Sequence, residues 1–103
     1  MSSLLKEVAT ERIFQSLAKQ WREETMFLSS LTQKVLHPAY QQIIGLGPDA
    51  LPLILRELKE NGGHWFWALG AITRENPVAA EDAGRVKKMK EAWLDWGKQH
   101  GLI

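Results

Sequence analysis

The chain contains no cysteine among its 103 residues. Disulfide bonds, thiolate metal ligands and a cysteine nucleophile are therefore excluded. Two domains would each be marginal at this length, so we expect a single domain over residues 1–103. The apolar fraction of 45% and the charged fraction of 24% are typical of a globular protein rather than a disordered one.

Long apolar runs are also missing. The longest candidate, from Trp65 to Ile72, has eight residues, whereas a helix needs about 20 apolar residues to span a bilayer. The first residues lack a basic region followed by an apolar run, so they do not resemble a secretory signal. We therefore expect a cytoplasmic protein that does not contact a membrane.

The sequence has little excess charge and none of the common enzyme motifs. The chain has thirteen basic and twelve acidic residues. The formal net charge of +1 argues against a protein whose whole surface binds nucleic acid. The histidines His37, His64 and His100 lie in no recognised metal motif, and there is no nucleophile elbow or glycine-rich phosphate loop. We predict no catalytic, cofactor or metal site, no small-molecule substrate, and a protein that is not an enzyme. An enzyme would require a polar pocket around His37, Tyr40 or His64.

What the chain does have is helical periodicity. Residues 4–24 carry apolar side chains at the i, i+3, i+4, i+7 spacing of one helical face. This predicted inner face comprises Phe14, Leu17, Ala18 and Trp21. Leu5 and Val8 could extend the face toward the N-terminus, and residues 1–8 are expected to fray.

Punctuating residues divide the remainder into further helices. Pro38 suits the first turn of a new helix, Asn61-Gly62-Gly63 is a strong stop, and Asn76-Pro77 marks a connection. A strand is possible over 65–72, but its Ala and Leu content favours a helix. The further predicted helices are 30–36, 38–44, 47–60, 65–72 and 83–99. Ser29 or Ser30 is a plausible N-cap of the first of these. The last has one apolar face, which comprises Val86, Met89, Trp93 and Trp96. The sequence therefore predicts an all-α fold, a compact bundle of about five helices.

The middle of the chain resembles a HEAT-type helical repeat. The matching residues of the first helix are Gly47, Pro48, Ala50, Leu51, Pro52, Leu55 and Leu58, and those of the second are Ala68, Leu69, Gly70 and Ile72. The resemblance covers residues 43–73 and implies a helical hairpin over 47–74. It amounts to one repeat, whereas about three are normally needed for a solenoid.

A longer segment is similar to a small uncharacterised bacterial protein family. Its hallmarks here are His37-Pro-Ala-Tyr-Gln-Gln-Ile-Ile-Gly, Leu51-Pro-Leu-Ile-Leu-Arg-Glu-Leu, His64-Trp-Phe-Trp-Ala-Leu, Asn76-Pro-Val and Ala92-Trp-Leu-Asp-Trp-Gly. The resemblance implies a bacterial source and a compact domain. It brings no activity, cofactor or catalytic residue with it.

Five tryptophans are the least ordinary feature of the composition. Helical spacing places Trp21 and Trp93 in the core, but so small a domain cannot fully bury five indoles. Trp65 and Trp67 would project about 200° apart on a helix, so Trp65 faces the core while Trp67 or Phe66 faces outward. Because tryptophan is enriched at interfaces, we predict a partner-binding set of Trp65, Phe66 and Trp67. The favoured function is a protein-interaction module, such as an adaptor, an inhibitor or an antitoxin-like partner, or a homo-oligomer.

A local basic cluster supports an alternative. Arg85, Lys87, Lys88 and Lys90 lie at the start of the last predicted helix, where they could contact phosphates. Glu91 is one helical turn from Lys87 and could pair with it, so a solvated helix face is the simpler interpretation. The alternative function is a nucleic-acid-associated accessory protein.

Overall fold

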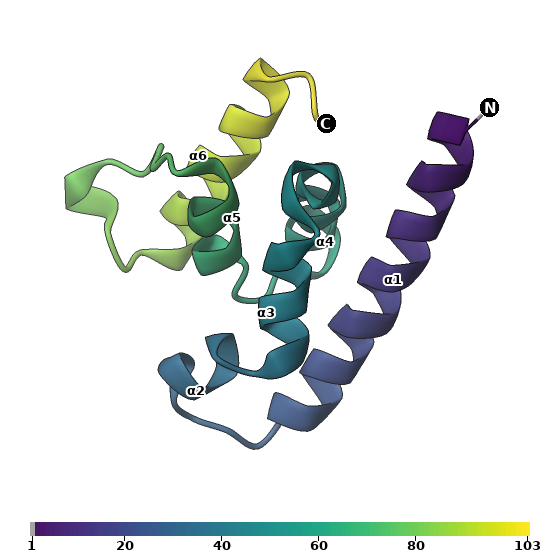
Figure 1. Cartoon of the computed structure of the whole chain (residues 1–103). Helices are drawn as coiled ribbons and strands as arrows, with labels where there is room; N and C mark the ends of the chain where they lie inside the picture. Colours follow the sequence, from purple (N-terminus) through teal and green to yellow (C-terminus); the bar gives the residue numbers. More distant parts are fainter. Residues whose placement is uncertain (1) are drawn as a thin grey trace. The chain divides into compact units, whose positions relative to one another are not determined.

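The computed structural model describes residues 2–103, with side chains from residue 4 onward, and it contains helices and no strand over that range (Figure 1). The all-α prediction is thus confirmed. The α-helices are α1 (Ser2–Thr25), α2 (Leu31–Val35), α3 (Pro38–Gly45), α4 (Leu51–Asn61), α5 (Phe66–Thr73) and α6 (Val86–Gln99), and two short 3-10 turns are η1 (Gly47–Ala50) and η2 (Ala80–Asp82). The chain forms two compact units, an N-terminal unit that ends at Ala50 and a C-terminal unit from Leu51 to Ile103. The single domain over residues 1–103 stays a prediction.

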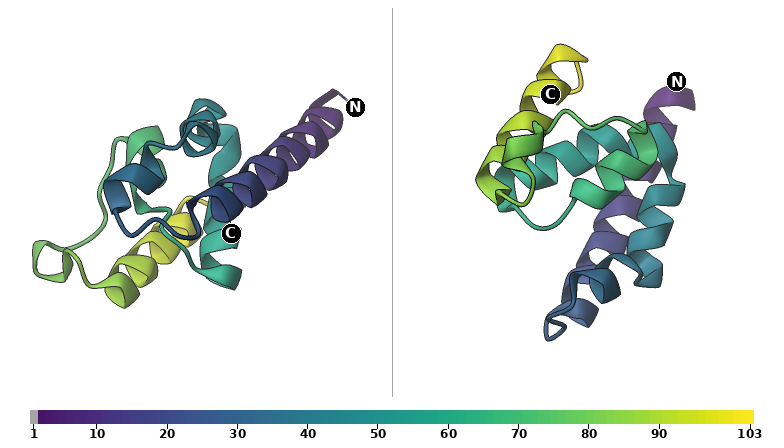
Figure 2. Two further views of the ribbon diagram at one scale, coloured as in Figure 1. Left: turned by 90° about the horizontal axis from the view of Figure 1, so that it is seen from below. Right: turned by 90° about the vertical axis from the view of Figure 1, so that its left-hand side faces the viewer.

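The N-terminal unit is built on the packing of α1 against α3, which lie side by side in Figures 1 and 2. The predicted face of α1 is buried at Phe14, Ala18 and Trp21. The ring centroids of Trp21 and Tyr40 lie 5.1 Å apart, with the ring planes tilted by 51°. The predicted face of α1 is therefore confirmed at three of its four positions, and the fourth, Leu17, is half-buried.

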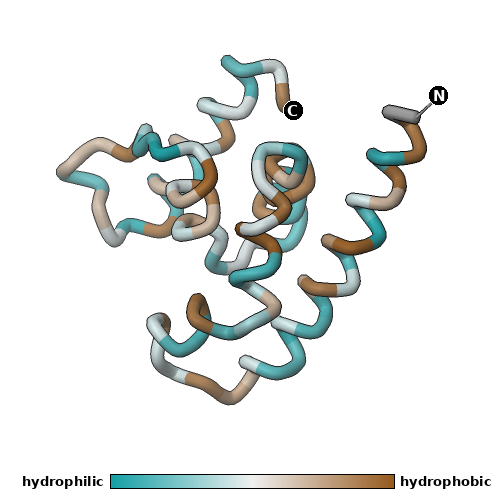
Figure 3. Tube along the Cα trace, viewed as in Figure 1, coloured by the Kyte–Doolittle hydropathy of each residue, from teal (hydrophilic) through white to brown (hydrophobic). Residues whose placement is uncertain are grey.

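The start of α1 differs from the sequence prediction. The helix begins at Ser2, while Met1 lies outside the described residues, and Leu5 and Val8 are exposed rather than part of the buried face. Leu5 precedes Phe14 by nine residues, which places it about 180° away around the helix. The apolar positions at this end of α1 stand out in the hydropathy colouring of Figure 3.

Two caps connect the helices of the N-terminal unit. The Ser30 hydroxyl accepts a hydrogen bond from the Gln33 amide (3.3 Å) and so caps α2, as predicted for a serine at this position. The N-cap of α3 is His37, whose Nδ1 accepts a hydrogen bond from the Ala39 amide at 3.0 Å. The Trp21 indole donates to the carbonyl oxygen of Lys34 at 2.8 Å, which fixes the end of α2 against α1.

In the C-terminal unit, α6 packs against α4. The two helices approach closely at Gly97, where an added Cβ would lie 2.8 Å from Cδ1 of Leu55. The buried rings of Trp93 and Trp96 meet edge to face, with centroids 5.5 Å apart. Val86, expected on the same helical stripe, is instead exposed.

The helix predicted over 65–72 forms as α5, which runs from Phe66 to Thr73 with Trp65 as its N-cap. It ends at Arg74, which adopts the left-handed conformation with φ of 57° and donates its amide to the Gly70 carbonyl at 2.8 Å. Residues 74–85, hereafter the 74–85 loop, make a wide excursion that carries η2 before α6 begins (Figure 1). The last helix therefore starts at Val86 rather than near Ala83. None of the helices between Ser2 and Gln99 combines the length and the apolar character that crossing a membrane requires.

Candidate interaction site

The C-terminal unit contains a pocket of about 520 Å³, bordered by α5, the 74–85 loop and the first half of α6. Its lining is mainly apolar and aromatic. The largest apolar side chains in the lining are Phe66, Trp67, Val78, Met89 and Trp93. This volume lies within the range of about 300–1,000 Å³ found for ligand pockets, and the predominance of apolar and aromatic groups is typical of them.

The lining also includes three polar side chains, those of His64, Glu75 and Asn76. The His64 ring meets the edge of Phe66 with centroids 5.3 Å apart and an interplanar angle of 89°. The side-chain oxygen of Asn76 accepts a hydrogen bond from the Val78 amide at 3.1 Å, which turns the chain past the adjacent proline. The pocket wall formed by the loop is thus held by local hydrogen bonds.

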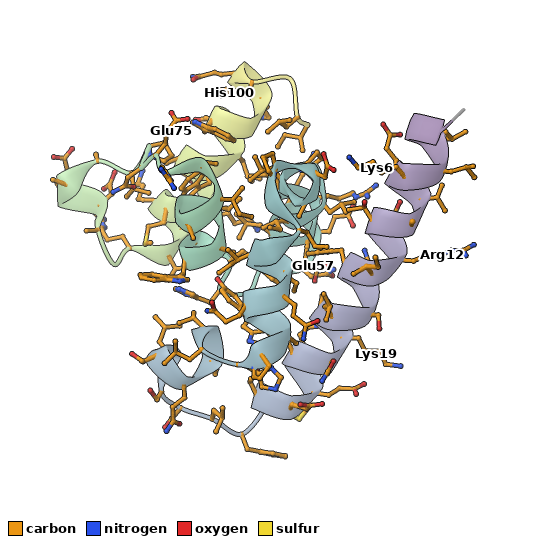
Figure 4. All side chains as sticks on the ribbon, in the orientation of Figure 1. Lys6, Arg12, Lys19, Glu57, Glu75 and His100 are labelled. Carbon is orange, nitrogen blue, oxygen red and sulfur yellow. The ribbon has the colours of Figure 1, made fainter. Side chains whose placement is uncertain are left out.

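Glu75 is positioned by both its backbone and its carboxylate. Its amide donates to Oγ1 of Thr73 at 3.1 Å, and that hydroxyl donates to the Leu69 carbonyl at 2.7 Å. Its Oε1 accepts a hydrogen bond from the Trp96 indole at 3.3 Å. Trp96 in turn stacks on His100, with ring centroids 4.0 Å apart. Figure 4 labels Glu75 and His100, which lie beside the C-terminal half of α6.

The three aromatic residues of the predicted partner-binding set occupy different environments. Trp65 is 1% exposed and Phe66 is 7% exposed, whereas Trp67 is 59% exposed. Helical spacing had placed Trp65 inward and Trp67 or Phe66 outward, and Trp67 is the one that reaches solvent. Phe66 and Trp67 both line the pocket, so this pair is available to a ligand there.

The basic cluster is distributed over exposed and ion-paired positions. Arg85 lies 3.6 Å from a carboxylate oxygen of Asp82, and Lys88 lies 3.8 Å from one of Glu91. The expected partner of Glu91 was Lys87, but the contact at i, i+3 forms instead. Lys87 is exposed and Lys90 is half-buried. Two of the four predicted phosphate-binding cations therefore already face a carboxylate.

The remaining candidates serve structural contacts. Tyr40 is fully buried, His37 caps α3, and His100 stacks on Trp96. His64 alone among the three residues considered for an enzyme pocket lies in the 520 Å³ pocket. Among the residues from Ser2 to Ile103, no group of three or more His, Asp or Glu side chains is arranged to hold a metal ion.

A second set of exposed apolar side chains lies in the N-terminal unit. It comprises Met26, Phe27, Leu31 and Leu36, and Phe27 is 94% exposed. These residues follow α1 or belong to the short α2 and its C-cap. They offer a natural comparison for Trp67, since both places expose a large aromatic side chain.

The sequence did not reveal Glu75 and Asn76 as pocket residues. They enter the pocket because α5 stops at a left-handed residue and the loop turns back, and neither step follows from apolar spacing. The one available signal was Asn76-Pro77, which indicates a turn without saying where the turn leads.

No protein-family model matches the chain, and no curated protein or solved structure shows significant similarity to it. The resemblance to a HEAT-type repeat therefore stays a prediction.

Proposed function

We propose that the protein is a small bacterial protein-interaction module, an adaptor, inhibitor or antitoxin-like partner. Its binding site is the pocket of the C-terminal unit together with the exposed indole of Trp67. The observation that carries this proposal is the position of Trp67, which is 59% exposed beside a largely apolar pocket of about 520 Å³. An indole left in water at the edge of an apolar hollow gains stability when a partner covers it.

The magnitude of this effect supports a binding role. Burying a large apolar side chain fully contributes about 1.5–3 kcal/mol, and a small number of tryptophan, tyrosine and arginine residues carry most of the energy of protein interfaces. Trp67 and Phe66 make the direct contacts in this proposal. Trp65 contributes by holding the start of α5 in the core.

The same proposal includes the HEAT-like hairpin. It is supported by two consecutive helices, α4 and α5, separated by a turn in which Gly62 and Gly63 have φ of 72° and 95°. Glycine reaches such positive angles without steric cost. Stacked helical repeats of this type use extended concave surfaces to bind partners, and in the hairpin here Trp67 of α5 is exposed.

Site-directed photo-crosslinking can identify the partner in cells of the source organism. A benzoylphenylalanine placed at Ala80, an exposed position of the 74–85 loop outside the pocket lining, would sample whatever approaches this face. The matched control is the same group at Ala9, an exposed position of α1 in the N-terminal unit. A product specific to position 80 is expected, either with another protein or with a second copy of this chain.

Affinity with the purified partner then decides the proposal. Trp67→Ala is expected to weaken binding at least tenfold, as for an interface hot spot. Phe27→Ala removes an aromatic side chain that is even more exposed and is expected to change affinity less than twofold. Equal effects of the two variants, or no effect of Trp67→Ala, would reject the pocket as the binding site.

Nucleic-acid association through Arg85, Lys87, Lys88 and Lys90 stays the second candidate. The observation in its favour is that Arg85, Lys87 and Lys88 are exposed together at the start of α6. The ion pairs of Arg85 with Asp82 and of Lys88 with Glu91 weaken it, because a phosphate would have to compete with both carboxylates.

A further inference from the structure

We propose that the group which enters the pocket is an arginine side chain of the partner protein, with Glu75 as its counter-ion. This inference rests on the proposed function, since it names the partner chemistry of the same site. It combines two properties of the lining, its aromatic rings and its single carboxylate.

The aromatic content of the pocket suits a cation. The rings of Phe66, Trp67 and Trp93 line it, and indole is the side chain that attracts cations most strongly. A purely apolar ligand group would bind equally well in a pocket lined by aliphatic side chains. Of these three side chains Trp67 is 59% exposed, whereas Phe66 and Trp93 are buried, so the Trp67 indole is the ring that a positively charged occupant would contact.

The formal charge of the pocket lining also favours a positively charged ligand. Glu75 is the only lining residue with a formal charge when His64 is neutral. The elements that border the pocket also carry cations outside the lining, and two of these, Arg85 and Lys88, pair with Asp82 at 3.6 Å and with Glu91 at 3.8 Å. The others are Arg74, Lys87 and Lys90. Glu75 is therefore the residue of the lining that can pair with a positive group.

The carboxylate of Glu75, an exposed residue, makes one hydrogen bond. The Trp96 indole donates to Oε1 at 3.3 Å, and the backbone of Glu75 is fixed by Thr73. A carboxylate has two oxygens and about four lone-pair sites, so the hydrogen bond from Trp96 leaves acceptor capacity for a ligand.

Arginine fits this combination better than lysine does. Its planar guanidinium stacks on aromatic faces, pairs with carboxylates through two parallel hydrogen bonds and is more weakly hydrated than an ammonium group. Its aliphatic stem would cover the apolar part of the lining, including Val78 and Met89, while the charged end reaches the carboxylate.

The test is an NMR titration of the full chain, in which the Trp67 indole signal is assigned by its loss in Trp67→Phe. The probes are two blocked pentapeptides, Gly-Ser-Arg-Ser-Gly and the same peptide with norleucine in place of arginine, together with tetramethylammonium. The arginine peptide is expected to shift the Trp67 signal saturably and to bind about fivefold or more tightly than either other probe, as for a charge-assisted contact.

Two charge variants isolate the role of the carboxylate. Glu75→Gln retains an oxygen that can accept from Trp96 but removes the charge, and it is expected to weaken the arginine peptide about fivefold or more while leaving the norleucine peptide unchanged. Glu81→Gln removes the same charge from the same loop outside the pocket lining, and it is expected to change affinity less than twofold. Equal effects of the two variants would overturn the proposal, because they would indicate general electrostatic attraction.

The possible results distinguish a failure of the arginine assignment from a failure of the proposed interaction function. If norleucine binds at Trp67 as tightly as arginine, the pocket is an apolar anchor site, so the arginine assignment fails while the interaction module stands. If tetramethylammonium binds as tightly as the arginine peptide, the site selects a small organic cation and the arginine assignment also fails. If no probe shifts the Trp67 signal and Trp67→Ala leaves partner affinity unchanged, both proposals fail.

Discussion

Nε2 of His37 lies 2.8 Å from Oε1 of Glu24, which joins the N-cap of α3 to the last turn of α1. Nδ1 of the same imidazole accepts the Ala39 amide at 3.0 Å. A neutral imidazole that accepts at Nδ1 carries its proton on Nε2 and can donate it to the carboxylate. The His37 side chain therefore caps α3 through Nδ1 and links α3 to α1 through Nε2.

Removal of this cap is expected to lower stability. His37→Ala leaves the Ala39 amide without its acceptor and should reduce the free energy of unfolding by about 1 kcal/mol, as for other N-caps. His37→Asn supplies a side-chain oxygen of comparable capping strength and gives up only the exposed contact with Glu24, which contributes less than about 1 kcal/mol. Urea unfolding of both variants measures the difference, and an asparagine variant as unstable as the alanine variant would show that capping is not the main role of His37.

Gly97 is expected to resist substitution although it lies within a helix. An added Cβ would lie 2.8 Å from Cδ1 of Leu55 and 3.2 Å from Ile103. Leu55 is fully buried and has little room to move. We expect Gly97→Ala to lower the free energy of unfolding by about 1–2 kcal/mol, because overpacking outweighs the gain of about 1 kcal/mol in helix propensity.

The matched control for this substitution is Gly45→Ala in α3. No atom lies within 4 Å of a Cβ built at Gly45, so only helix propensity changes there. Its free energy of unfolding is expected to stay the same or to rise by up to about 1 kcal/mol. A Gly97→Ala variant that gained stability like the control would mean that α4 and α6 tolerate a wider separation.

Arg74 is expected to be a site of stored backbone strain. It is the only non-glycine residue with positive φ in the described part of the chain, at the position where helices commonly end in glycine. Arg74→Gly is expected to raise the free energy of unfolding by about 0.5–1 kcal/mol, since the left-handed conformation is costly for a residue with a Cβ. Arg74→Ala keeps that cost and serves as the control, so a stability gain in both variants would point to the arginine side chain instead of the backbone.

The sequence predicted the cores of the helices better than the connections between them. The faces containing Phe14, Trp21 and Trp93 could be read from spacing because apolar periodicity reflects burial directly. Leu5 and Val86 were assigned wrongly to buried faces, since periodicity says nothing about how far a neighbouring helix extends. The pocket was missed because its polar wall depends on the end of α5 at Arg74 and the path of the 74–85 loop, which is set by individual hydrogen bonds.

The nucleic-acid alternative leads to a different measurement. Because Arg85 and Lys88 already pair with carboxylates, we expect the chain to bind a duplex no more tightly than the non-specific range of about 10⁻⁴–10⁻⁶ M. We also expect the double variant Lys87→Glu, Lys90→Glu to leave partner affinity unchanged. Binding that is markedly tighter, falls steeply with salt and is abolished by the double variant would favour the nucleic-acid function instead.

Substitutions in the predicted partner-binding set distinguish effects on folding from effects on binding. Trp65 is 1% exposed, so Trp65→Ala opens a cavity and is expected to lower the free energy of unfolding by about 3–5 kcal/mol. Trp67 is 59% exposed, so Trp67→Ala is expected to change the free energy of unfolding by no more than about 0.5 kcal/mol. Where Trp65→Ala does not fold, Trp65→Phe provides a milder cavity. Urea unfolding followed by circular dichroism tests this order, and a Trp67→Ala variant as unstable as the Trp65 variants would mean that loss of binding at Trp67 reports unfolding rather than a lost contact.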